Sequence, residues 1–270
     1  MTANALTGAH LKVARARYHI QNLQAAIQGF ANTNPYKYAV RDEPETGKRI
    51  YYLADDVVIH EAIHLVAGDV IQNTRNALDH LAYGLVLIAN PSGIPGSKER
   101  QIAFPVAENA TKYISSRGRI TSLVTPAAIK TIDAIEPYGG GKGSILWQLH
   151  ALSNIDKHRL PLVVAGQFAA ADLGTHIKGM MIDAFPDLTE GLAGMDLTCF
   201  FEAANKTCPL KAGDPLLSDL IDNKVNEEMK FKIEIALYEP QIIDAQPIGP
   251  ALERFVNAVD RVVRQFDALV

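Results

Sequence analysis

The sequence is poor in cysteine and in long apolar runs, and it carries little net charge. Cys199 and Cys208 are the only cysteines, and residues 1–10 lack the charged start and apolar run of a signal peptide. We therefore expect a cytoplasmic protein with two reduced thiols, although the two cysteines could also bridge a β-hairpin. The most apolar stretch, residues 81–89, is far shorter than the roughly 20 residues that a bilayer requires. It predicts a core helix and excludes a membrane span.

The charge balance gives no general attraction to polyanions. Basic residues number 26 and acidic residues 30, so the formal net charge is −4 and the isoelectric point lies near 6.1. Any RNA site must then be a local basic patch. With 48% hydrophobic residues and a mean hydropathy of +0.02, the composition excludes a disordered or fibrous protein. No cofactor is expected.

Apolar spacing predicts a helix over residues 11–30, and two β-prone runs at 36–40 and 49–53 predict a hairpin. Asp55 or Asp56 can cap a long apolar helix that ends near Asn90. Gly68 lies inside it and predicts a kink or a close helix crossing. Further helices are expected over residues 112–135, as one or two helices, and from Ser144 to residue 158.

From residue 160 onward the sequence turns to β-branched and aromatic runs. Strands are predicted over 160–165, 176–185, 197–202 and 230–238, followed by a helix after Pro247. The apolar stripe expected on that helix consists of Leu252, Phe255, Val256, Val259, Val262, Val263 and Phe266. The predicted class is α+β: a helical domain over 1–159, and a β-rich region over 160–270 that is closed by a helix and packed on the first domain.

His60, Glu61 and His64 have the spacing of a zinc peptidase. Two histidines four residues apart share one face of a helix, and a glutamate between them can act on the metal-bound water. The extended form of the motif is excluded, because Ala67 and Val70 stand where it requires glycine and histidine. No local pattern supplies a third ligand. Two helix-face histidines that contact polar partners are therefore the simpler interpretation.

The segment from Gly68 to Ala82, GDVIQNTRNALDHLA, and the segment LSNIDKHR at 152–159 resemble blocks of a widespread family of bacterial proteins with no established activity. This resemblance covers about residues 53–160 and indicates relatedness without a function. As that family's pattern is known, it begins near Gly68 and leaves out His60 and His64, which weakens the zinc interpretation.

Arg75, Asn76 and His80 also resemble the Arg-Asn-x-x-x-His motif of HEPN domains, helical modules that include many metal-independent endoribonucleases. This resemblance implies that Arg75 neutralises the scissile phosphate while His80 moves the proton of a ribose 2′-OH, with Asn76 and Asp79 orienting them. In HEPN domains the Arg and His usually come from two protomers, so the resemblance also implies a homodimer. Arg75 and His80 lie about 140° apart on an ideal helix, so a second protomer or a second helix must complete the site.

The second polar block offers a partner face for this helix, at positions four residues apart. Its candidate substrate-binding residues are His150, Asn154, Lys157, His158 and Arg159. If this face packs against Asp79, the two blocks form either an active site or a structural brace of ion pairs. The leading hypothesis is a HEPN-like RNA nuclease or RNA-binding protein in stress or defence. A non-catalytic interaction module with a buried brace and a zinc hydrolase are the alternatives.

Overall fold

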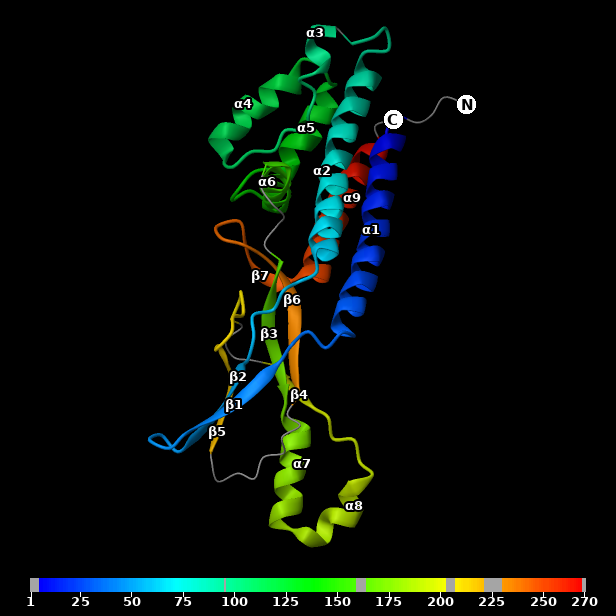
Figure 1. Cartoon of the computed structure of the whole chain (residues 1–270). Coiled ribbons are helices and arrows are strands. Elements are labelled where there is room, and N and C mark those ends of the chain that lie inside the picture. Colours follow the sequence, from blue (N-terminus) through cyan, green and yellow to red (C-terminus); the bar gives the residue numbers. More distant parts are fainter. Residues whose placement is uncertain (1–4, 95, 159–163, 203–206, 221–229, 269–270) are drawn as a thin grey trace. The chain divides into compact units, whose positions relative to one another are not determined.

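The structure is a computed structural model that describes residues 5–94, 96–158, 164–202, 207–220 and 230–268 (Figure 1). The chain forms two compact units, each built from separate segments. Unit 1 comprises residues 1–27, 61–163 and 239–270, and unit 2 comprises residues 28–60 and 164–238. The predicted α+β class is confirmed. The predicted boundary at 159/160 does not follow these units, because the hairpin region belongs to unit 2 and the last helix to unit 1.

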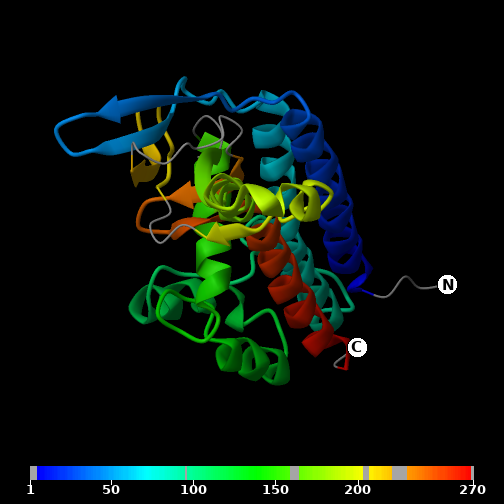
Figure 2. The ribbon, with the colours of Figure 1, turned by 90° about the horizontal axis from the view of Figure 1, so that it is seen from below.

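Three long helices run alongside one another in unit 1: α1 (Thr7–Ala31), α2 (Glu61–Ala89) and α9 (Ile248–Asp267) (Figures 1 and 2). Polar contacts link α1 to α9, since Arg17 pairs with Asp260 at 3.1 Å. The predicted stripe of α9 is buried along its whole length, from Leu252 to Phe266. Burial of this stripe against the other helices is what holds α9 in unit 1.

Helix α2 is one continuous helix, and Gly68 marks a close crossing with α6 (Ser144–His158). A Cβ atom at position 68 would lie 2.5 Å from Oδ1 of Asp156, so a side chain there would collide with α6. The predicted start of α2 at Asp55 or Asp56 is wrong. Asp56 accepts a hydrogen bond from the backbone N–H of Ala212 at 2.8 Å, and α2 begins five residues later.

The predicted helical stretch 112–135 is two helices, α4 (Ala110–Thr121) and α5 (Pro126–Ile135). Each has its own side-chain cap: Asn109 accepts from the N–H of Lys112, and Thr125 accepts from the N–H of Ala128. Pro126 occupies the first turn of α5, where a missing N–H costs nothing. The short helix α3 (Gly96–Glu99) and strand β7 (Ile243–Pro247) also belong to unit 1. In the described ranges, no helix combines the length and apolarity needed to cross a membrane.

Unit 2 contains two antiparallel sheets. The predicted hairpin is confirmed as β1 (Tyr38–Glu43) and β2 (Lys48–Leu53), with Val40 opposite Tyr51, and β5 (Pro215–Leu220) adds a third strand. In the second sheet, β3 (Val164–Asp172) lies between β4 (Phe200–Glu202) and β6 (Phe231–Glu239). The apolar core shared by the sheets consists of Leu53, Phe168, Ala171, Leu210 and Leu216.

One predicted strand is wrong. Residues 176–185 fall mostly within α7 (Leu173–Ala184), which is followed by a 3₁₀ turn at Pro186–Leu188 and by α8 (Thr189–Ala193). Ile177, Met180 and Met181 are spaced by three and four residues, which is the helical period. All three side chains are substantially exposed. They are therefore not packed on a sheet face, which is what the predicted strand required.

Candidate functional site

Arg75 lies at the centre of a polar network that joins α2 to α6. The residue is only 5% exposed, and all three nitrogen atoms of its guanidinium donate hydrogen bonds. Nη1 donates to Oδ1 of Asp79 at 2.7 Å, and Nε donates to Nδ1 of His150 at 3.1 Å. Nη2 donates to the backbone carbonyl of Phe104 at 3.4 Å. Each of these contacts lowers the cost of holding the buried charge.

Asp79 fixes the loop that covers this network. Its Oδ1 accepts the bond from Arg75, one helical turn earlier, and also the backbone N–H of Phe104 at 3.1 Å. The backbone of Phe104 therefore forms two hydrogen bonds to α2: its carbonyl accepts from Arg75 and its N–H donates to Asp79. The side chain of Phe104 is 1% exposed and anchors the same loop in the core. The loop that follows α3 is thus tied to α2 by polar and apolar contacts together.

His150 is held in its neutral form. Burial, and then the neighbouring positive charge of Arg75, lower the pKa of His150 from its ordinary value to about 4. Because Nδ1 accepts from Arg75, the neutral ring carries its proton on Nε2. The side-chain amide nitrogen of Asn154 lies 3.1 Å from Nε2, and a turn of the amide by 180° places its oxygen there as the acceptor of this proton. Both ring nitrogens are therefore occupied.

A second polar contact locks α2 to α6 one turn away. Nε2 of Gln72 donates to Oδ2 of Asp156 at 2.7 Å and to the carbonyl of Ser153, while the Ser153 hydroxyl donates to Oε1 of Gln72. Ser153 is fully buried, so these bonds satisfy groups that water cannot reach. The close approach at Gly68 places Asp156 in this arrangement.

An open hollow of about 540 Å³ lies beside His150, between α4 and α6. Its lining residues are Val106, Ala107, Glu108, Lys112, Ser115, Ser116, Arg119, Trp147, His150, Ala151, Asn154 and Ile242. One wall is fixed by the backbone pairing of Ala107 with Tyr138 and Gly139. His150 thus belongs both to the polar network around Arg75 and to the lining of the hollow.

The hollow presents two cations, hydroxyl groups and one indole ring. Lys112 is paired with Glu108, one turn earlier in the chain. Arg119 is exposed and forms no ion pair within the described residues. Trp147, the only tryptophan of the chain, is half-buried. A cation, hydroxyl groups and an aromatic face are the groups that recognise phosphate and a stacked ring together.

The structure does not bring His80 to Arg75. His80 is exposed and its ring lies against α1, where a Cβ atom on Gly8 would stand 2.7 Å from Nδ1 of His80. Asn76 is half-buried on α2. The histidine that contacts Arg75 is His150 instead. The spacing of the HEPN-like motif is therefore present in the sequence, but Arg75 and His80 contact different neighbours within one chain.

Of the second polar block, His150 and Asn154 take part in the network and line the hollow. Lys157 is exposed. Arg159 and the side chain of His158 lie outside the part of the chain that the structure describes.

The zinc-like motif lies at the N-terminal end of α2. His60 precedes α2, Glu61 is its first residue and His64 follows within the helix. The motif therefore spans the start of α2, with His60 immediately before the helix. Within the described ranges, no group of three or more histidine, cysteine or acidic side chains is placed to hold a metal ion.

Sequence reasoning missed Lys112, Arg119, Trp147 and the carbonyl of Phe104. Lys112 and Arg119 of α4 lie seven residues apart, which is the spacing of one helical face, and Arg117 between them pairs with Asp133. That spacing was a usable signal. The carbonyl of Phe104 had none, since a backbone group acquires its role only from the fold.

Comparison with known proteins gives no relative: neither family models, curated proteins nor solved structures match this chain.

Proposed function

We propose that this protein binds single-stranded RNA in the hollow between α4 and α6 and does not cleave it. The observation that carries the proposal is the saturation of Arg75: all three of its nitrogens donate to groups within the protein. An arginine in this state braces a helix pair, while the accessible arginine of the hollow is Arg119. The brace thus keeps α6 in place so that Trp147, His150 and Asn154 form one wall of the hollow.

The same geometry argues against acid–base catalysis by the predicted residues. A general base must reach the proton that it abstracts, directly or through one water. His150 has both ring nitrogens engaged and a pKa of about 4, so near neutral pH it is not an imidazolium and cannot act as a general acid. His80, which the motif assigns this role, lies against α1 rather than beside Arg75.

The hollow offers separate groups for the base and for the backbone of RNA. The Trp147 ring can stack on a base, an interaction worth about 1–3 kcal/mol for each base. Arg119 and Lys112 can contact phosphates, and the hydroxyls of Ser115 and Ser116 can bond phosphate oxygens or a 2′-OH. Since the chain carries a net charge of −4, binding must come from this local arrangement. The resemblance of the Arg75 segment to HEPN domains supports RNA as the polymer.

The intrinsic fluorescence of Trp147 tests this proposal, because it is the only tryptophan. An oligouridine of about 12 nucleotides, within the length range of known single-strand sites, is titrated in EDTA and low salt. We expect quenching of the fluorescence that weakens as salt is raised, with the RNA recovered uncut. The Arg119→Ala variant should bind about tenfold more weakly, without loss of thermal stability.

Arg100→Ala is the matched control, because Arg100 is an exposed arginine outside the lining of the hollow. Its affinity for oligouridine should equal that of the wild type. Unchanged Trp147 fluorescence, together with no binding at low salt, would contradict the proposal. Cleavage in EDTA that is lost in His80→Ala would replace it with the nuclease hypothesis.

A further inference from the structure

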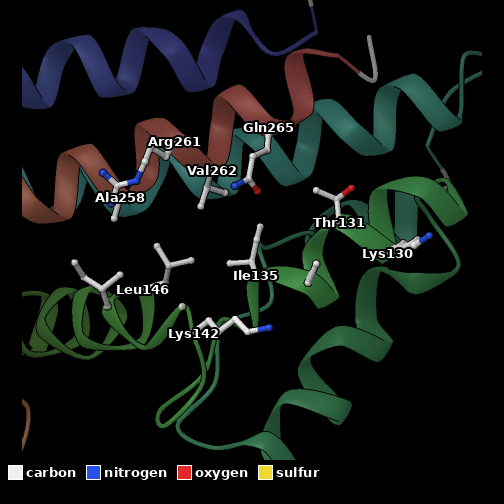
Figure 3. Close-up of a pocket in the computed structure, with 12 residues that line it drawn as sticks. Lys130, Thr131, Ile135, Lys142, Leu146, Ala258, Arg261, Val262 and Gln265 are labelled. Carbon is white, nitrogen blue, oxygen red and sulfur yellow. The ribbon is translucent and has the colours of Figure 1, made fainter.

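A second hollow, of about 520 Å³, lies elsewhere in unit 1, between α5, the start of α6 and α9 (Figure 3). Four residues come from each of these three regions: Lys130, Thr131, Ala134 and Ile135; Lys142, Gly143, Ile145 and Leu146; and Ala258, Arg261, Val262 and Gln265. Its volume is in the range of small-molecule sites in proteins. None of its lining residues belongs to the hollow beside His150.

The floor of this second hollow is aliphatic. Leu146 and Val262 are buried, and Ile135 and Ile145 are half-buried beside them. Figure 3 shows Ile135, Leu146 and Val262 between the opposed helices. No aromatic side chain is among the described lining residues. The floor therefore suits a flexible hydrocarbon chain better than a planar ring, which would require a stacking face.

The rim of the second hollow is cationic. Lys130, Lys142 and Arg261 are its only charged lining residues among those described, and all three are exposed. Within the described residues, Lys130 and Arg261 form no ion pair. Lys142 pairs with Glu136 at 3.2 Å. The rim thus has an excess of positive charge above an apolar floor.

Carboxylates near this rim are already matched by other cations. Asp260, next to Arg261 in sequence, pairs with Arg17 and with Arg264, both at 3.1 Å. Asp133 of α5 pairs with Arg117 at 2.6 Å. These acids therefore do not supply a partner for Arg261, and an external anion would meet an unneutralised guanidinium.

We infer that this second hollow binds an aliphatic carboxylate, with the hydrocarbon chain on the floor and the carboxylate at Arg261. Gln265 lies one helical turn from Arg261 on the same side of α9 and can donate a further hydrogen bond to the carboxylate. This inference does not rest on the RNA proposal, since the two hollows share no lining residue.

Calorimetric titration of the full chain with octanoate and decanoate, each below the concentration at which it forms micelles, tests the inference. Each added methylene should tighten binding up to about fourfold, which corresponds to about 0.8 kcal/mol for a buried methylene. Decyltrimethylammonium has the same chain with a cationic head, and it should not bind. Binding that ignores the length of the chain or the sign of the head group would overturn the inference.

Two variants connect the signal to the second hollow. Arg261→Ala should weaken decanoate binding about tenfold, whereas Arg264→Ala, on the same helix but outside the lining, should leave it unchanged. Ala134→Phe should block the hollow, and because Ala134 is exposed on α5, folding should persist. A melting temperature equal to that of the wild type checks this. Undiminished decanoate binding by Arg261→Ala and Ala134→Phe contradicts the assignment.

Anionic lipids offer the same chemistry at a membrane surface, so vesicles of phosphatidylglycerol are titrated in parallel. The inference requires saturable binding of monomeric decanoate. Binding to the vesicles alone, with no response to monomeric decanoate, would show a surface interaction and overturn it.

Discussion

Arg75 shows how a single buried charge determines the arrangement of a helix pair. Its partners come from α2, from α6 and from the loop at Phe104, so removal of the guanidinium breaks three contacts at once. The contact between the two polar blocks was predictable from sequence, because α2 and α6 each carry polar residues on an otherwise apolar face. Which histidine meets Arg75 was not predictable, since it depends on how the two helices are rotated about their axes.

Replacement of Arg75 by alanine should lower the free energy of unfolding by about 3 kcal/mol, because Asp79 and His150 lose a buried partner. For a chain of this size we expect a fall of roughly 5–10 °C in melting temperature. Thermal unfolding followed by circular dichroism measures it. Arg119→Ala removes an exposed arginine and should change stability by less than about 0.5 kcal/mol. Equal stabilities for the two variants would argue against the brace.

His150 should make stability depend on pH. Its pKa is about 4 in the folded protein and ordinarily near 6.5, so below pH 6.5 the unfolded chain binds a proton that the folded chain does not. Stability should therefore fall as the pH is lowered from about 6.5 to 4. We expect a loss of about 1–2 kcal/mol, less than the pKa change alone implies because the ring is partly exposed.

Denaturant unfolding at several pH values, compared with that of His150→Asn, isolates this contribution. Asparagine offers an acceptor near the position of Nδ1 but does not titrate. The variant should lose the part of the pH dependence that belongs to His150, while the contributions of other groups remain in both proteins. Identical pH profiles would mean that His150 is not held neutral.

At the scale of elements, helices with a one-sided apolar stripe were predictable and elements with mixed faces were not. Helix α9 has ten buried residues at helical spacing, and its sequence alone identified the stripe. In α7, Ile177 and Met180 are exposed, so burial in a core selects neither the helical period nor the alternation of a strand. Strand β5 was missed because it acquires its place by pairing with β2, about 165 residues earlier in the chain.

The apolar stripe of α9 should dominate its contribution to stability. Phe255 is 1% exposed, and Phe255→Ala should cost about 3–5 kcal/mol through the cavity that it leaves. Asn257→Ala changes an exposed position two residues later and should cost less than about 0.5 kcal/mol. Urea unfolding midpoints compare the two. A small effect of Phe255→Ala would mean that α9 adds little to unit 1.

At the scale of the whole molecule, the units are interleaved along the sequence. Unit 1 takes up its last segment only after the chain has passed through unit 2. Sequence texture suggested a boundary near residue 160, because helical patterns give way to β-prone runs there. The local residue pattern predicts secondary structure. The unit to which an element belongs depends instead on which faces, distant in sequence, pack together. The burial of α9 in unit 1 is such a tertiary outcome.

A fragment of residues 1–159 should therefore not fold as an independent helical domain. It keeps α1, α2 and α6 but lacks α9, so the faces that α9 covers become exposed to water. We expect helical content without a cooperative thermal transition. Addition of a peptide spanning residues 239–268 should restore cooperativity in a concentration-dependent manner. Cooperative unfolding of the fragment alone would contradict this.

The late position of α9 also bears on how the protein is made. Residues 159–247 are synthesised between the end of α6 and the start of α9. At rates of about 5–20 residues per second, this interval lasts on the order of 5–20 s. Throughout it, the apolar faces of α2 and α6 emerge from the ribosome with no α9 to cover them. Unit 1 contains the earliest of the described segments and is nevertheless completed only after the segments of unit 2 have been synthesised.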